Sequence, residues 1–377
     1  MTTPKPIMSR KTVRKTKRRT RDLIRGAPPA AARRVLPRCD DGVKRGCSDT
    51  GWRLIGSIRY SALNSDRIVS RASPRPNYGR FMLTERILRA MWPNGDSASP
   101  GLLAAVAADA ATVFRNYDLS SDLHVAHAMA QFHVECGSGV EMTENINYTP
   151  ERACEVWPTR FSDAADCLQK VGSFTGDPDF KIKLIDNVYG GRNGNRPDTH
   201  DGSTFIGRGL SQVTGRGNYE ALAKKLGNRL DLVNQPDLVN AAANALECGV
   251  ADFVMCGCLP LAAQDDLLGV SAMLNLGHRV NDPSKVVGFA ARKGALHLWK
   301  LALGVELPPA HSDTWVQVAL NRLGADPALV PDGVFALRSR VALKLFQRAH
   351  GLTPDGERTP QTLATLDAAL AALPTAP

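Results

Sequence analysis

The 377-residue sequence lacks any run of about 18 apolar residues, the length that a helix needs to cross a membrane. Its first residues are basic but no apolar stretch follows them, so we expect no Sec signal peptide. The eight cysteines are too few for a disulfide-built scaffold of this size, and their spacing fits no zinc motif. We therefore expect mostly reduced thiols, with a Cys154–Cys167 bridge only if the protein works outside the cytoplasm.

Glutamate is absent from residues 1–81, which hold 5 Lys, 16 Arg and 5 Asp and therefore carry a charge of +16. The whole chain carries +10, so residues 82–377 carry 10 − 16 = −6. Three interpretations of this basic, disordered-looking segment are open: an arm that binds nucleic acid or another anionic polymer, a solvated tail, or residues outside a natural protein that begins at Met82. We favour a start at Met82 over a nucleic-acid-binding arm, and do not expect nucleic acid as a partner.

Strand-like alternation is scarce between residue 82 and about residue 304, where apolar residues recur at intervals of three and four, as in "HVAHAMAQF". Ser120 or Ser121 is expected to cap the helix that contains this stretch. Gly-rich loops such as "YGGRNGN" and "GRGLSQVTGRGN" separate the expected helices. The pattern predicts a mainly α domain at 82–304 whose cleft is built from loops.

The last part of the chain shows a second, smaller pattern. Residues 305–313, "VELPPAHSD", are expected to form a linker, and residues 314–372 a small helical module. The module contains two "PDG" turns, at 331–333 and 354–356, each followed by a helix-like stretch. This internal echo predicts a repeated structural unit.

Three acids follow the apolar helix in "QFHVECGSGVEMTENINY", namely Glu135, Glu141 and Glu144. Glu135 lies at the expected helix end, where the helix dipole and a dry setting favour a protonated acid. Glu144 lies nine residues further on, in a polar run. Two carboxyls in unlike environments are typical of the acid and base of a glycosidase, although ordinary surface acids would give the same pattern.

Four segments resemble glycoside hydrolase family 19, and its bacterial and phage lysozyme-like branch in particular. They are "HVECGSG…TENINYTPERACEVWPTRF", "NVYGGRNGN", "DGSTFIGRGLSQVTGRGNYEALAKKLG" and "LVNQPDLV", in the family's order over residues 82–304. The resemblance implies a lysozyme-like α-helical fold and an inverting reaction. In that reaction an acid protonates the glycosidic oxygen while a base activates water, with the carboxyls roughly 6.5–9.5 Å apart.

The resemblance assigns roles to single residues. It makes Glu135 the acid and Glu144 the base, with Glu141 as the rival for the base. It makes the Thr214 hydroxyl the group that positions the attacking water, and Gln212 a group that binds the sugar. Further substrate-binding or loop-fixing residues are Asn275, Tyr148, Arg192, Asn195 and Arg208. For Arg208 a structural role, holding loop carbonyls from a buried position, is an equal alternative.

The chain departs from the family's usual His-Glu-Ser-Gly-Gly around the acid. Val134 stands where the family has histidine, and Cys136 stands where it has serine. His133 is displaced by one position, so it cannot be assumed to take the missing role. No metal or other cofactor is expected: His124 and His127 are interpreted as one face of a buried helix, because no HExxH motif accompanies them.

The C-terminal module resembles the type 1 peptidoglycan-binding domain in "VQVALNRLG", "PDGVFALRSRVALKLFQRAHGL" and "PDGERTPQTLATL". Phe346 and Leu345 are assigned to its core. Together the two resemblances imply a monomeric cell-wall lytic enzyme, an endolysin or autolysin, that cuts β-1,4 bonds of peptidoglycan at the bacterial wall. A chitinase is the first alternative, and a wall-binding protein without catalysis is the second.

Overall fold

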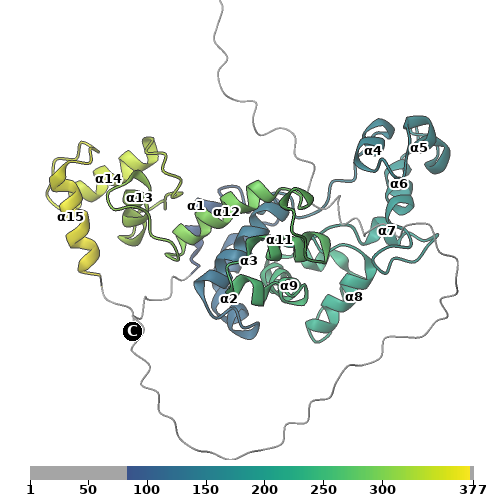
Figure 1. Ribbon diagram of the computed structural model, residues 1–377, viewed down its shortest axis with the longest axis horizontal. Coiled ribbons are helices and arrows are strands. Elements are labelled where there is room, and N and C mark those ends of the chain that lie inside the picture. The colour runs from purple at the N-terminus through teal and green to yellow at the C-terminus, as the bar shows by residue number, and fades with distance from the viewer. Residues whose placement is uncertain (1–82, 374–377) are drawn as a thin grey trace, which may run out of the picture.

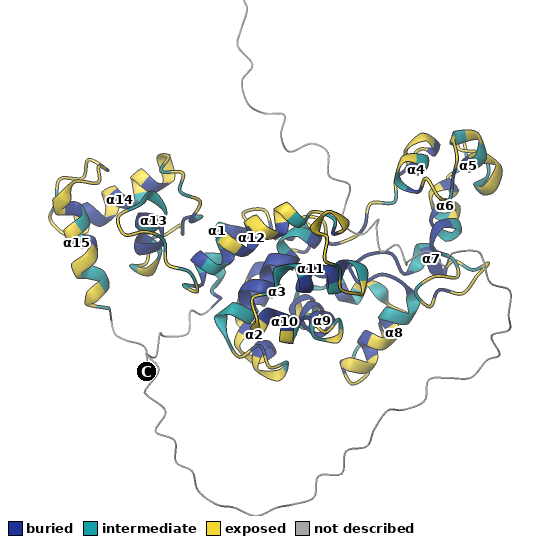
Figure 2. Cartoon of the chain, in the orientation of Figure 1, coloured by how far each residue is buried: buried dark blue, intermediate teal, exposed yellow. Residues whose placement is uncertain are grey.

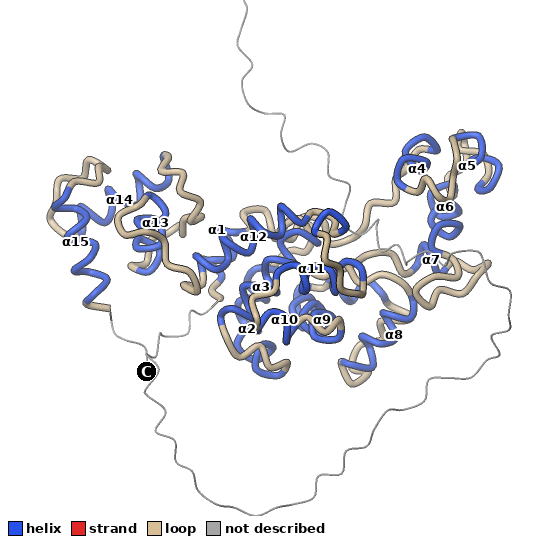
Figure 3. The backbone as a smooth tube through the Cα atoms, in the orientation of Figure 1, coloured by secondary structure: helices blue, strands red, loops and turns tan. Residues whose placement is uncertain are grey.

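The structure, a computed structural model, describes residues 83–373, so the interpretations of residues 1–81 lie outside the described residues. Over the described range the chain forms fifteen α-helices and no strand, which confirms the mainly α prediction (Figure 3). The helices of the first domain are α1 (Glu85–Met91), α2 (Leu102–Asn116), α3 (Asp122–Glu135), α4 (Pro150–Val156), α5 (Ala164–Val171), α6 (Phe180–Tyr189), α7 (Asp201–Thr204), α8 (Arg216–Lys225), α9 (Ala242–Met255), α10 (Leu259–Ala263), α11 (Leu267–Leu276) and α12 (Phe289–Ala302). The 3₁₀ helices are η2 (Pro236–Asn240) and η3 (Pro283–Lys285), and the last helices are α13 (Asp313–Arg322), α14 (Leu337–Ala349) and α15 (Pro360–Ala371).

Helix α3 is the central element of the larger lobe, where α1, α2 and α9 to α12 surround it (Figure 1). It begins at Ser121, whose hydroxyl accepts a hydrogen bond from the His124 amide at 3.2 Å, so the predicted cap is the second of the two serines. Val125, Met129 and Phe132 are buried, and small alanines between them let neighbouring helices approach closely. Figure 2 shows this helix as almost wholly buried.

The smaller lobe, α4 to α6, lies beside the larger one at the right of Figure 1. Its separate core contains Trp157, Phe161, Phe180 and Leu184. Isolated β-bridges join Thr143 to Arg208 and Arg208 to Val213, so the segment after α3 pairs with the loop between α7 and α8. These loops connect the lobes and, as predicted from their glycines, carry the candidate site.

A glycine is required where the chain turns after α3. Gly139 has a φ of +85°, and a Cβ there would lie 2.7 Å from the carbonyl oxygen of Gly95. Any side chain would therefore strain the backbone and clash with a main-chain atom. The turn directs the chain from the end of α3 back towards Glu144.

Helices α13 to α15 form the small C-terminal module around Val316, Leu343 and Leu366, which confirms a three-helix unit. The module contacts the first domain through α1. The Arg86 guanidinium donates to the carbonyl oxygen of Asn321 at 2.9 Å and to that of Ala325. Both carbonyls lie at the C-terminal end of α13, where a cation is favourable.

The internal echo of the module is confirmed by two glutamines with matching contacts. Gln317 donates to Asp332, to the Val334 carbonyl and to Ser339, and accepts from the Gly333 amide. Gln347 donates in the same order to Asp355, to the Glu357 carbonyl and to Thr362, and accepts from the Gly356 amide. Both glutamines are buried, so each side chain holds one of the two Asp-Gly turns.

The thiols of Cys154 and Cys167 form no disulfide bridge. Burial raises the pKa of Cys167 to about 11, which keeps that thiol protonated and unreactive at neutral pH. Among residues 83–373 no helix combines the length and the hydrophobicity needed to cross a membrane.

We predict that Gln347→Leu lowers the free energy of unfolding of the module by about 2 kcal/mol, because it leaves the buried Gly356 amide without its acceptor and removes one of the two side-chain partners of the Thr362 hydroxyl. The control is Gln361→Leu, at an exposed position of α15, which should change it by less than about 0.5 kcal/mol. Denaturant unfolding measures both values. Equal effects of the two substitutions would show that the Gln347 contacts do not stabilise the turn.

Candidate active site

Glu135 ends α3 and is 6% exposed, as expected for a carboxyl at the end of an apolar helix. Its Oε1 accepts a hydrogen bond from Nη2 of Arg292 at 2.7 Å. Arg292 comes from α12 and is fully buried, so the two charges form an ion pair inside the protein. The partner of this carboxyl is therefore a cation, which the sequence analysis did not anticipate.

Arg292 is held in place by more than the acid. Its Nη1 donates to Oε1 of Gln131 at 2.5 Å, and its Nε donates to the Val287 carbonyl at 3.1 Å. Gln131 in turn donates to the Ser271 hydroxyl at 3.2 Å. The guanidinium of this α12 residue therefore has three partners, two on α3 and one in the segment before α12, and Ser271 of α11 in turn holds Gln131.

Glu144 lies in the segment between α3 and α4 and is 4% exposed. Its Oε1 accepts from the Tyr189 hydroxyl at 2.8 Å, and its Oε2 accepts from the Gly207 amide at 3.1 Å. Burial raises the pKa of Glu144 above its ordinary value, while these two hydrogen bonds and the charge of Arg208 act in the opposite direction.

The environments of the two acids differ from each other. Glu144 lies in a polar run of the sequence, yet the loop from residue 207 and the smaller lobe cover it. Its partners are neutral donors, whereas the partner of Glu135 is a cation. Glu141 is exposed, and its carbonyl, not its carboxyl, contacts the loop.

The loop from Gly207 to Thr214, whose first amide donates to Glu144, contains three of the predicted residues, Arg208, Gln212 and Thr214. Gln212 has a φ of +55°, which is strained for a residue with a side chain. Its amide nitrogen donates to the carbonyls of Glu141 and Gly209, so only its oxygen remains to bind a ligand. The Thr214 hydroxyl, also buried, donates to the Gln212 carbonyl at 3.0 Å.

Arg208 and Asn195 fix loops. Arg208 donates to the carbonyls of Thr204 and Ile206 and to the Tyr219 hydroxyl, and pairs with Asp237 at 2.6 Å. Asn195 donates to the Tyr189 carbonyl and accepts from the Arg216 amide. The buried-arginine alternative for Arg208 accounts for these contacts. Asn195 acts through the position of Tyr189, the donor to Glu144.

The remaining predicted residues lie in different surroundings. Arg192 is exposed and follows Tyr189 closely in the chain. Asn275 is buried and accepts from the Val287 amide at 3.1 Å, next to the carbonyl that holds Arg292. Tyr148 is buried, its ring lies 4.8 Å from that of Trp157, and its hydroxyl has no hydrogen-bond partner within the described part of the chain.

Two departures from the family pattern have a local explanation. The Cys136 thiol donates to the Phe132 carbonyl at 3.0 Å and accepts from the Gly139 amide at 3.2 Å, so it fixes the turn after the acid. Burial raises the pKa of Cys136 to about 12, which keeps it unreactive. His133 accepts from the Trp92 indole at 3.2 Å and takes no part in the contacts of Glu135.

Arg292, Gln131 and Tyr189 were missed by the sequence analysis. A signal existed for one of them, because His127, Gln131 and Glu135 recur every four residues on an otherwise apolar helix. Such a polar stripe predicts a buried polar seam. In the structure His127 contacts Asp265 at 2.8 Å. Among residues 83–373 no three His, Cys, Asp or Glu side chains gather as they would around a metal ion.

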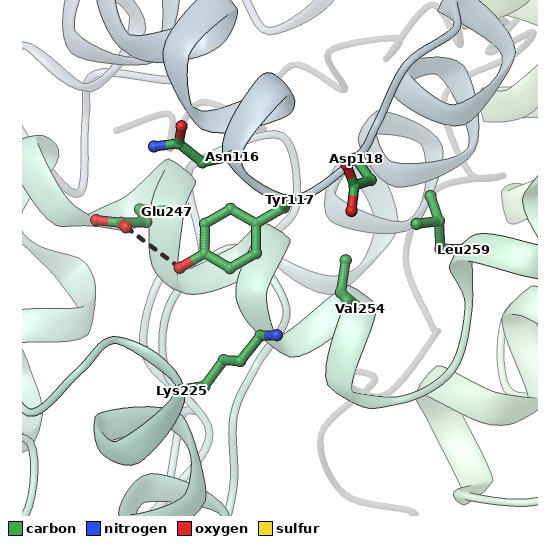
Figure 4. Close-up of a pocket in the computed structure, with 7 residues that line it drawn as sticks. All are labelled: Asn116, Tyr117, Asp118, Lys225, Glu247, Val254 and Leu259. Atoms are coloured by element: carbon green, nitrogen blue, oxygen red, sulfur yellow. Dashed lines mark hydrogen bonds between the residues drawn. The ribbon is translucent and has the colours of Figure 1, made fainter. Parts of the chain in front are cut away.

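A pocket of about 280 Å³ lies elsewhere, between the end of α2 and helices α8 and α9 (Figure 4). Tyr117 donates to Glu247 at 3.2 Å across it, and Lys225 lies over the tyrosine ring. None of the predicted site residues lines this pocket, whose lining consists of Asn116, Tyr117, Asp118, Lys225, Glu247, Val254 and Leu259.

Comparison with known proteins places the C-terminal module. Residues 313–366 match the family model of a peptidoglycan binding domain, which confirms the expectation for this part of the chain. A search of curated proteins found no match to the chain.

Two solved structures resemble the first domain. Chitinase C from Streptomyces griseus HUT6037 aligns at 17% identity and a TM-score of 0.36, covering 60% of this chain and 78% of its own. A bacterial family 19 chitinase aligns at 20% identity and a TM-score of 0.32, covering 60% of this chain and 97% of its own. Both TM-scores are low, so the chemistry of the site rests on its own residues.

We predict that Arg292→Met lowers the free energy of unfolding by about 3–5 kcal/mol, because Glu135 is then buried without its cation. Adding Glu135→Gln should restore part of this loss, because the amide has no charge to bury. The control is Arg229→Met, which breaks an exposed pair with Glu247 and should cost at most about 1 kcal/mol. Denaturant unfolding measures these three variants and Glu135→Gln alone. Additive losses in the double variant would contradict a buried ion pair.

Proposed function

We propose that the chain is a cell-wall lytic glycoside hydrolase that cuts β-1,4 bonds of peptidoglycan by an inverting mechanism. The observation that carries the proposal is the pair of buried carboxyls, Glu135 and Glu144, each held by different partners. Inverting glycosidases need two such groups, one to donate a proton and one to accept it.

Glu135 is assigned the role of acid and Glu144 that of base. Arg292 occupies Oε1 of Glu135, which leaves Oε2 to carry and deliver the proton. Both oxygens of Glu144 accept one hydrogen bond, and each has a second lone pair with which to take a proton from water.

Thr214 and Gln212 complete the assignment. The Thr214 hydroxyl donates to a carbonyl and can accept a hydrogen bond from the attacking water. The Gln212 oxygen, the part of its amide outside the loop contacts, is assigned to a sugar hydroxyl or amide. Asn275, Tyr148, Arg192, Asn195 and Arg208 are assigned to substrate binding or to holding the loops that bind it.

The C-terminal module favours peptidoglycan over chitin as the substrate. A wall-binding unit in the same chain keeps the cleft at a high effective concentration near wall glycans. The module supports action at the bacterial cell wall, and the proposed protein is a monomeric endolysin or autolysin. Chitin has the same β-1,4 linkage, so a chitinase that uses the same residues is the alternative.

We predict that Glu135→Gln and Glu144→Gln each lower the rate of peptidoglycan hydrolysis roughly 10²-fold or more, because each removes a proton-transfer group. Glu141→Gln, at an exposed site on the same turn, should keep at least half of the wild-type rate. Release of soluble fragments from purified peptidoglycan, and from chitin in parallel, gives the rates. Full activity of Glu135→Gln would refute the assignment of Glu135 as the acid. A loss of activity in Glu141→Gln but not in Glu144→Gln would assign the base to Glu141. Binding of peptidoglycan without hydrolysis of either polymer would favour the non-catalytic alternative.

We predict that Tyr189→Phe moves the acidic limb of the pH–rate profile to higher pH. The Tyr189 hydroxyl bonds to the ionised carboxyl and lowers the pKa of Glu144, so its removal raises the pH at which the base becomes ionised. Tyr117→Phe is the control, because that hydroxyl contacts Glu247. Values of kcat/KM between about pH 3 and 9 provide the measurement, and a limb that stays in place or moves to lower pH would contradict Glu144 as the base.

A further inference from the structure

An exposed stripe of aliphatic side chains runs along α14 in the C-terminal module. Leu337, Val341 and Leu345 are 75%, 47% and 51% exposed, and Val334, just before the helix, is 61% exposed. The three helix residues are spaced by four, so they lie on one face. Figure 2 shows the exposed face of this helix. Leu345 was assigned to the core from the sequence, and its exposure shows that this assignment is wrong; only Phe346 is buried.

Positive charge is concentrated on the same helix. Residues 313–373 contain six Lys and Arg and six Asp and Glu, so the module is neutral as a whole. Four of the six cations, Arg338, Arg340, Lys344 and Arg348, lie on α14, which has no acid. All four are exposed and alternate with the aliphatic stripe.

The acids near this helix leave most of its charge available. Glu357 pairs with Arg340 at 2.6 Å, and Asp355 accepts from Gln347 and from backbone amides. For Arg338, Lys344 and Arg348 the described part of the chain provides no ion pair. The charge of Asp355 partly offsets that of Lys344, so the face presents Arg338, Arg348 and a partly compensated Lys344 between three aliphatic side chains.

We propose that this face of α14 binds the surface of an anionic phospholipid bilayer. The cations match lipid phosphates, and the aliphatic side chains can enter the boundary between headgroups and acyl chains, which is how basic amphipathic helices lie on membranes. A glycan is a poorer match, because its hydroxyls would be buried against aliphatic groups that form no hydrogen bonds. The wall-binding surface of the module is therefore a different face.

The test measures binding of the full-length protein to vesicles of equal parts phosphatidylglycerol and phosphatidylcholine by co-sedimentation. Leu337→Gln/Leu345→Gln should weaken binding about tenfold or more, because it removes the apolar contact and keeps every charge. Val305→Gln/Leu307→Gln, at exposed linker positions, is the matched control and should stay within about twofold of wild type. All variants keep residues 1–82, so the charge of that segment is the same in each.

Two further measurements separate the contribution of charge from that of apolar contact. Arg338→Gln/Lys344→Gln/Arg348→Gln should also weaken binding, and at about 0.5 M NaCl its remaining difference from wild type should shrink, because salt screens charge but not apolar contact. Vesicles of phosphatidylcholine alone should bind weakly. Unchanged vesicle binding by the Leu337/Leu345 variant would overturn the proposal. The proposal would also be overturned if the Leu337/Leu345 variant bound vesicles normally but lost binding to purified peptidoglycan. That result would assign this face of α14 to wall binding.

Discussion

The buried ion pair between Glu135 and Arg292 is the interaction on which the arrangement of the first domain depends. Charges taken out of water are costly unless they are paired and fully hydrogen-bonded, and here the guanidinium is bonded to Glu135, Gln131 and the Val287 carbonyl. These contacts join α3 to α12 at one depth and one orientation. They also fix the carboxyl at the end of α3, next to the turn that leads to Glu144. The residues that stabilise the core therefore also position the acid.

The second acid, Glu144, is held by neutral hydrogen-bond donors and, among residues 83–373, not by an ion pair. Within the described part of the chain, a phenol and a backbone amide donate to the two oxygens of Glu144. Burial raises its pKa, and these donors limit the rise. Two carboxyls with a charged and a neutral environment can differ in proton affinity, which is what an acid and a base working together require. The smaller lobe supplies Tyr189 and so takes part in this tuning.

Helix positions, the Ser121 cap and the duplicated turns of the C-terminal module were predictable, because each depends on local spacing. The partners of the acids were not. Arg292 lies beside Lys293 in α12, and only tertiary packing makes the first fully buried and leaves the second exposed. Glu144 is buried by a loop that lies more than sixty residues later in the chain. In that loop Gln212 has a strained, positive φ, and its side-chain amide nitrogen donates to the loop instead of remaining available for a ligand. Exposure of Leu345 was missed because helical spacing does not say which face a small module leaves uncovered.

The stereochemistry of the first product tests the two-carboxylate account most directly. Proton NMR during the first minutes of peptidoglycan hydrolysis, before mutarotation, would show the configuration of each new reducing end, and mass spectrometry would identify the sugar that carries it. The account predicts reducing ends released as the α-anomer, inverted from the β-linkage, because water attacks the face opposite the departing oxygen. Reducing ends released as the β-anomer, or fragments without a new reducing end, would contradict the assignment of Glu144 as a base that activates water.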